Sequence, residues 1–132
     1  MSASGAAIAA RARALIGRRF RPQGRDPKLG LDCVGTAAAA LDAGPVPSDY
    51  AARGHSLAWI EAELWAHGCI EAEAAEAGDV IVCRPARDQY HLLVCVGEAF
   101  VHADARLRRI VERPMPPPWP VAGVWRLQSG EE

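Results

Sequence analysis

One cysteine and two histidines have the types and the spacing that covalent chemistry requires. Cys33 lies in an Asp-Cys-Val-Gly element directly before an alanine-rich run. His91 begins a later apolar run, and His102 lies in the β-prone run that follows it. A thiol at the start of a helix with histidines on two later strands provides a nucleophile, a base and a group that orients the base. The combination predicts a hydrolase or an acyl-transferase.

Each of these residues has an expected role. The thiolate is the nucleophilic form of cysteine, so a helix dipole at Cys33 and an imidazolium at His91 are expected to lower the thiol pKa. His91 is the predicted base, and His102, after a short turn, is predicted to orient the His91 ring. Backbone N–H groups at the helix start are expected to bind the oxyanion. Asp32 is interpreted as a helix N-cap rather than a catalytic acid.

The same residue types also have structural interpretations. A single histidine on a strand is more often half-buried and hydrogen-bonded than catalytic, and His55 and His67 keep this interpretation. The other three cysteines lie outside the Asp-Cys-Val-Gly element, and Cys83 and Cys95 in apolar strand patterns are expected to be core residues. No two cysteines form a CxxC pair, so we do not expect a zinc knuckle. We also expect no other metal site and no cofactor. The order of cysteine, histidine and second histidine is what favours catalysis.

The elements that must position these residues divide into a helical front half and a β back half. Apolar spacing and caps predict helices over residues 5–16, 33–42 and 57–67, the last capped by Ser56. β-prone runs predict strands over residues 80–83, 92–96, 100–102, 108–112 and 121–127. Residues 18–31 are expected to form a loop, and the proline-rich residues 114–120 an extended connector. The predicted class is α+β, with N-terminal helices packed on an antiparallel sheet of about five strands.

Composition limits the classes of function. A chain of 132 residues, 50% of them hydrophobic, can form one compact domain over residues 1–132. The net charge of -1 gives no reason to expect a nucleic-acid partner. No apolar run reaches membrane-spanning length, so no membrane insertion is expected. Arg11 and Arg13 interrupt the stretch that a signal peptide keeps apolar, so we expect synthesis in the cytoplasm without a signal peptide.

These motifs resemble those of the NlpC family of cell-wall cysteine peptidases, which have a compact papain-like fold. The family's nucleophile, base and orienting residue match Cys33, His91 and His102, and Gly78-Asp79 marks the strand before the base. The resemblance covers about residues 15–127. It implies a single NlpC-like domain that hydrolyses peptidoglycan stem peptides, typically between D-glutamate and a diamino acid.

Within that family, three sequence elements resemble the small peptidases of phage tails and gene transfer agents. The elements are residues 24–27, residues 30–35, and Trp119 with residues 123–126. The resemblance implies phage-like tail proteins as partners. It also implies a particle-associated enzyme that acts in the periplasm of a target cell.

Three residues depart from the family pattern beside the predicted site. Val34 stands where serine is usual, Tyr90 precedes the base where glycine is common, and Phe20 occupies the region of a tyrosine hydroxyl near the oxyanion. With Asp32, they form the expected surroundings of the substrate and oxyanion. The departures leave two alternatives open: a weak or inactive tail or adaptor protein with the same fold, and an amidase or acyl-transferase on another substrate.

Overall fold

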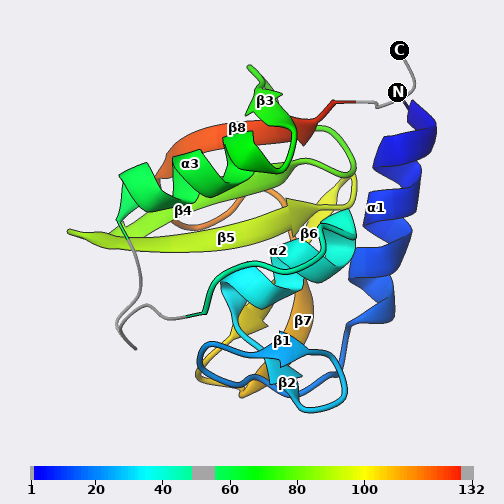
Figure 1. Ribbon diagram of the computed structural model, residues 1–132, viewed down its shortest axis with the longest axis vertical. Coiled ribbons are helices and arrows are strands. Elements are labelled where there is room, and N and C mark those ends of the chain that lie inside the picture. The colour runs from blue at the N-terminus through cyan, green and yellow to red at the C-terminus, as the bar shows by residue number, and fades with distance from the viewer. Residues whose placement is uncertain (1, 49–55, 129–132) are drawn as a thin grey trace.

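The computed structural model describes residues 2–48 and 56–128 (Figure 1). In this part of the chain the helices are α1 (Ser2–Ala14), α2 (Cys33–Leu41) and α3 (Leu57–Ala66). One antiparallel sheet contains the strands β3 (Cys69–Glu71), β4 (Val80–Ala86), β5 (Gln89–Cys95), β6 (Ala99–Asp104), β7 (Arg109–Pro114) and β8 (Val121–Leu127). The strand order is β3-β8-β4-β5-β6-β7. The predicted α+β class, with helices packed on an antiparallel sheet, is confirmed.

Two features of the sheets differ from the predicted elements. Strand β3 adds a sixth strand to the sheet and pairs with β8. The predicted loop over residues 18–31 contains the strands β1 (Arg25–Asp26) and β2 (Gly30–Leu31), which pair with each other. Strands of two or three residues are too short to show an alternating pattern, so their pairing depends on what the fold places beside them.

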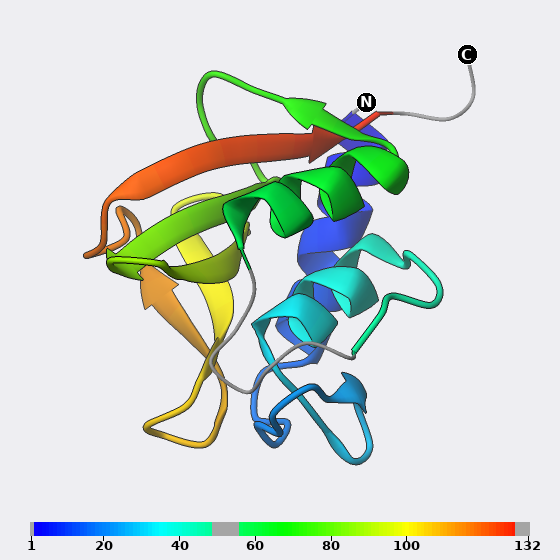
Figure 2. The same cartoon turned by 60° about the vertical axis from the view of Figure 1, so that its left-hand side comes forward.

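The sheet is buried on both faces, which explains why its central strands are apolar without interruption. On β5, Leu92 and Val94 belong to the core beneath the helices, whereas Leu93 and Cys95 belong to a second cluster on the opposite face. The views in Figures 1 and 2 show α1 beside α2. The second cluster is covered in part by the proline-rich connector between β7 and β8, which contributes Trp119. No helix in residues 2–48 or 56–128 has the length and hydrophobicity needed to cross a membrane.

Strands β5 and β6 pair over a short length only. Their register consists of Val94 opposite Val101 and Cys95 opposite Phe100. Toward the start of β5 and the end of β6 this pairing stops, and α2 packs against both strands. The first turn of α2 therefore lies beside backbone of β5 that β6 does not cover.

Two glycines bring α2 close to the loop that precedes it. A Cβ atom added at Gly35, in the first turn of α2, would overlap the carbonyl oxygen of Gly24. A Cβ atom added at Gly24 would in turn overlap the carbonyl oxygen of Gly30. The absence of side chains at these positions allows the loop to pass directly against the helix start, which carries Cys33.

We predict that Gly35→Ala destabilises the protein, although alanine is the better helix former. Helix propensity alone would favour alanine by about 1 kcal/mol, but overlap with backbone that cannot move aside costs roughly 1–3 kcal/mol. Denaturant unfolding should therefore show a net decrease in the free energy of unfolding. The matched control, Ala39→Gly in the same helix, should cost about 1 kcal/mol by propensity alone. A Gly35→Ala variant as stable as the wild type would contradict this packing argument.

Candidate active site

Cys33 is the first residue of α2, and Asp32 caps the helix. One Asp32 carboxylate oxygen accepts the Gly35 N–H at 2.7 Å, and the other accepts the Gln23 N–H at 3.1 Å. Two backbone donors that water would otherwise satisfy are thus bound by one side chain. The N-cap interpretation of Asp32 is confirmed, and its carboxylate is fully engaged in holding the helix start.

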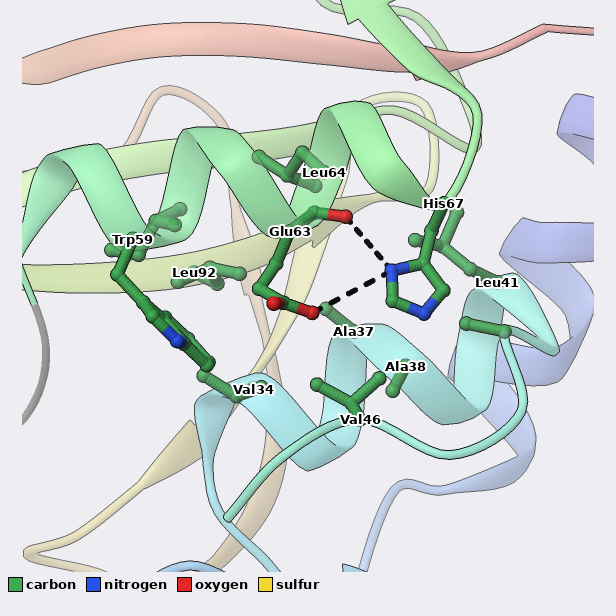
Figure 3. A pocket seen from close by; sticks show the side chains of 12 residues that line it. Val34, Ala37, Ala38, Leu41, Val46, Trp59, Glu63, Leu64, His67 and Leu92 are labelled. Atoms are coloured by element: carbon green, nitrogen blue, oxygen red, sulfur yellow. Dashed lines mark hydrogen bonds and ion pairs between the residues drawn. The ribbon is translucent and has the colours of Figure 1, made fainter. Parts of the chain in front are cut away.

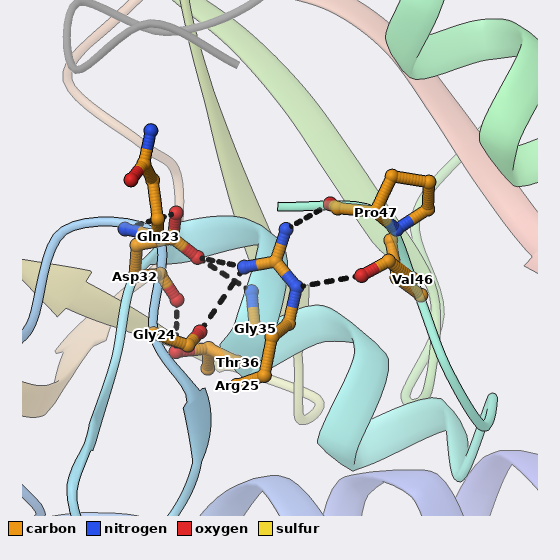
Figure 4. Close-up of polar contacts among 8 residues, drawn as sticks. All are labelled: Gln23, Gly24, Arg25, Asp32, Gly35, Thr36, Val46 and Pro47. Atoms are coloured by element: carbon orange, nitrogen blue, oxygen red, sulfur yellow. Dashed lines mark hydrogen bonds and ion pairs between the residues drawn. The ribbon is translucent and has the colours of Figure 1, made fainter. Parts of the chain in front are cut away.

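Arg25 connects Asp32 to Val46 and Pro47, which follow α2 in the chain (Figure 4). Its guanidinium forms an ion pair with the Asp32 carboxylate at 3.0 Å. It also donates hydrogen bonds to the carbonyl oxygens of Gly24, Val46 and Pro47. Because both charged groups are largely buried and each makes several bonds, the position of the helix start is well determined.

His91 on β5 and His102 on β6 form a hydrogen-bonded pair. Nε2 of His91 lies 2.8 Å from Nδ1 of His102, and the two rings meet edge to face. His102 is buried, and burial lowers its pKa to about 4, while the Asp104 carboxylate raises it and the Arg113 guanidinium lowers it. His102 is therefore a neutral imidazole at physiological pH.

The neutral state of His102 limits the proton arrangements of the pair. A neutral imidazole carries one proton, so one nitrogen donates and the other accepts. If His91 donates from Nε2, its Nδ1 is left unprotonated and can act as a base, and the His102 proton lies on Nε2. That Nε2 atom is buried and has no hydrogen-bond partner among the described residues. This arrangement gives His91 the tautomer that a general base needs.

Trp119 covers the histidine pair from the proline-rich connector. Its ring centroid lies 5.4 Å from that of His91 and 5.7 Å from that of His102, both edge to face. Such contacts restrict the orientation of both imidazole rings and limit the access of water. Trp119 is not among the predicted site residues. The sequence feature that could have indicated its role is a large aromatic residue in a proline-rich segment that cannot pair in a sheet.

A groove of about 530 Å³ joins the cysteine to the histidines. Six of the seven predicted site residues line it: Phe20, Asp32, Cys33, Tyr90, His91 and His102. Further lining residues that the sequence analysis missed include Gln23, Gln89, Asp104, Arg106, Arg113 and Trp119. Within residues 2–48 and 56–128, no three His, Cys, Asp or Glu side chains form a group that could hold a metal ion.

The Val34 side chain lies outside this groove. It is buried and lines a small apolar hollow between α2 and α3, together with Trp59 (Figure 3). At the edge of that hollow, Nδ1 of His67 lies 2.8 Å from the Glu63 carbonyl oxygen, which fits the structural interpretation of His67. His55 lies outside the described residues. Val34 therefore borders the site through its backbone alone.

The expectation of a low thiol pKa at Cys33 is wrong for the free protein. The pKa of the half-buried Cys33 is raised to about 12, chiefly by desolvation of the thiol and to a smaller extent by the Asp32 carboxylate. The N–H of Leu92, the Arg25 charge and the N–H of Val34 lower it by less. The Asp32 cap that stabilises the helix start also places a negative charge beside the sulfur. A protonated thiol must therefore lose its proton during a reaction rather than before it.

Comparison with known proteins identifies the fold. No protein-family model and no curated protein matches the sequence. The solved structure of NlpC1 from Trichomonas vaginalis aligns over 95% of this chain at 20% identity with a TM-score of 0.69, and NlpC2 from the same organism over 96% at 19% identity with 0.69. The crystal structure of the NlpC/p60 domain of the peptidoglycan hydrolase SagA aligns over 83% at 23% identity with a TM-score of 0.56.

The alignments differ in how much of the other protein they cover. The chain spans 44% of the length of NlpC1 and 47% of that of NlpC2, but 88% of the SagA domain. At these identities the likeness concerns the fold, and the chain has the papain-like α+β fold of NlpC/p60 domains. What the groove does chemically has to be argued from its own residues.

We predict that alkylation of Cys33 by iodoacetamide is slow at neutral pH and accelerates without a plateau. A thiol with a pKa raised to about 12 has a thiolate fraction that grows tenfold per pH unit until the pH reaches its pKa. The rate should therefore rise about tenfold per unit from roughly pH 7 to roughly pH 10. Mass spectrometry of peptides from labelled native protein separates Cys33 from the three buried cysteines. A rate that levels off near neutral pH would show a preformed thiolate and contradict the raised pKa of Cys33.

Proposed function

We propose that this protein is a cysteine peptidase that hydrolyses peptidoglycan stem peptides between D-glutamate and a diamino acid. The observation that carries the proposal is the 2.8 Å pair of His91 and His102 in the groove that also contains Cys33. The NlpC/p60 fold supports this reading, because one protein of that fold, SagA, is described as a peptidoglycan hydrolase.

The groove residues support a mechanism in which charge develops only during the reaction. Nδ1 of His91 takes the proton from the Cys33 thiol while the sulfur bonds to the carbonyl carbon of the scissile amide. The imidazolium then gives that proton to the departing amine, and a thioester remains on Cys33. A water molecule, deprotonated by His91, attacks the thioester carbonyl and releases the acid and the free thiol. Throughout, Nδ1 of His102 accepts the N–H of His91 Nε2 and keeps the ring in place.

Backbone N–H groups are the proposed oxyanion donors. Phe20 lines the groove but has no hydroxyl to donate, so this site relies on the start of α2, including the N–H of Cys33. The N–H groups of Val34 and Leu92 already face the sulfur and stabilise it as it becomes a thiolate. Loss of one side-chain donor costs an enzyme about 10²- to 10³-fold in rate, so a slow peptidase is consistent with these residues.

The raised Cys33 pKa and the missing hydroxyl at Phe20 also favour a second candidate. In that case the protein is a weak or inactive tail or adaptor protein that keeps the fold and not the activity. An amidase or acyl-transferase on another substrate would use the same three residues. Digestion of purified peptidoglycan, with the released fragments identified by mass spectrometry, distinguishes the peptidase from the other two candidates.

We predict that Cys33→Ala abolishes the release of stem fragments and that His91→Ala reduces it by at least about 100-fold, because these variants lack the nucleophile and the base. His102→Gln should retain a fraction, roughly 1–10% of the rate, because the amide oxygen still accepts the His91 N–H. Cys95→Ser, a substitution in the second core cluster, is the control that should lower stability modestly and leave the rate unchanged. Unchanged turnover by Cys33→Ala would refute the mechanism.

We further propose that the enzyme is associated with a phage-like tail and opens the target cell wall in the periplasm. The support is the resemblance of residues 24–27, residues 30–35, and Trp119 with residues 123–126 to tail peptidases. Fractionation of particles should recover the protein with tail structures, and particles that lack it should adsorb but deliver DNA poorly. Protein found free in the periplasm of growing cells, without particles, would overturn the delivery proposal and leave the peptidase proposal intact.

A further inference from the structure

Arg113 is a cation of the groove that the proposed mechanism does not use. It lies on β7, opposite Phe100 of β6 in the ladder, and lines the groove together with Cys33 and the histidines. Its guanidinium carbon lies 5.4 Å from the Trp119 ring centroid and 6.0 Å from that of Phe100. Contact with two aromatic rings restricts the guanidinium, so less conformational entropy is lost when it binds a ligand.

No acidic group of the groove forms an ion pair with Arg113 among the described residues, although the Arg113 charge is near enough to help lower the pKa of the Asp104 carboxyl. The Asp32 carboxylate is bound by Arg25 and by backbone donors. The Asp104 carboxylate accepts the N–H groups of Arg106 and Leu107, each at 2.9 Å. Among residues 2–48 and 56–128, no carboxylate lies within 4.0 Å of the Arg113 guanidinium, and no oxygen accepts a hydrogen bond from it.

A second guanidinium has the same character. Arg106 is exposed at the groove, and in the described part of the chain its side chain also forms no ion pair or hydrogen bond. The groove therefore combines carboxylates that are already bound with guanidinium groups whose donors are available. This arrangement is complementary to an anionic ligand and not to a cationic one.

We propose that Arg113 binds a carboxylate of the substrate, and that the groove thereby selects stem peptides that carry a free carboxylate beside the scissile bond. The inference rests on the proposed function and specifies its substrate class. Glutamate has two carboxyl groups, so when one forms the scissile amide the other is either a free carboxylate or a blocked carboxamide. The planar guanidinium can donate two parallel hydrogen bonds to the two oxygens of a carboxylate. A carboxamide has only one oxygen that can accept, and its NH2 group would face a guanidinium N–H, so that two donors would meet.

The test uses two synthetic stem peptides that are identical except for that group, one with the free carboxylate and one with the carboxamide. Wild-type protein should cleave the carboxylate peptide with a kcat/KM about 10- to 100-fold higher, the range of a charged hydrogen bond. Arg113→Gln should lower kcat/KM for the carboxylate peptide far more than that for the carboxamide, so that the ratio of the two approaches 1. Arg113→Lys should keep part of the preference. Arg109→Gln, on the same strand but outside the groove, is the control that should retain all of it.

Binding separates this inference from the proposed function. Calorimetry with the Cys33→Ala variant measures the affinity for both peptides without turnover. If neither peptide is cleaved by wild-type protein but Cys33→Ala binds the carboxylate peptide more tightly, and Arg113→Gln removes that difference, the peptidase proposal fails and the carboxylate site stands. If both peptides are cleaved and bound equally well, the carboxylate site is refuted and the peptidase proposal stands. Circular dichroism of Arg113→Gln and Arg113→Lys verifies that each variant is folded.

Discussion

The Asp32 carboxylate connects the segments on which the candidate site is built. It binds the first turn of α2, the Gln23 N–H of the preceding loop and the Arg25 guanidinium, which reaches the carbonyl oxygens of Val46 and Pro47. One side chain thus fixes the helix start that carries the thiol. The same negative charge raises the pKa of Cys33. Precise positioning and an easily ionised thiol are therefore in conflict at this site, and the structure favours positioning.

The site lies where a sheet ladder ends. Because β5 and β6 pair over two residue pairs only, backbone of β5 is left for other contacts, and the Leu92 N–H faces the Cys33 sulfur. Across the same gap the side chains of His91 and His102 meet. The end of a ladder thus supplies both a backbone donor and space for side chains within an otherwise buried core. Trp119 packs against the rings of His91 and His102, so the proline-rich connector that carries it is part of the site and does more than join β7 to β8.

The electrostatics of the groove divide into a neutral centre and a charged rim. Desolvation raises the pKa of the Cys33 thiol and lowers that of the His102 imidazole, which favours the neutral form of both groups in the free protein. Arg106 and Arg113 supply positive charge around that centre. A neutral centre avoids the cost of burying charge before a substrate is present. The Asp104 carboxylate lies at the same rim but is bound by backbone N–H groups, so the guanidinium groups of Arg106 and Arg113 are the ones available to an anionic ligand.

The sequence alone determined the α+β class, the helices and the longer strands, because apolar periodicity and caps such as Ser56 and Asp32 are local signals. It also indicated Cys33, His91 and His102 as one group, through their order along the chain. Only the tertiary structure decided the rest. The three residues of β3 carry no pattern, Trp119 and Arg113 reach the groove by packing across the sheet, and the Cys33 pKa depends on what buries the sulfur. The periodicity of apolar residues indicates which face of a helix or strand is buried. Which residues of different elements meet, and how deeply a given atom is buried, depends on contacts between segments far apart in the chain.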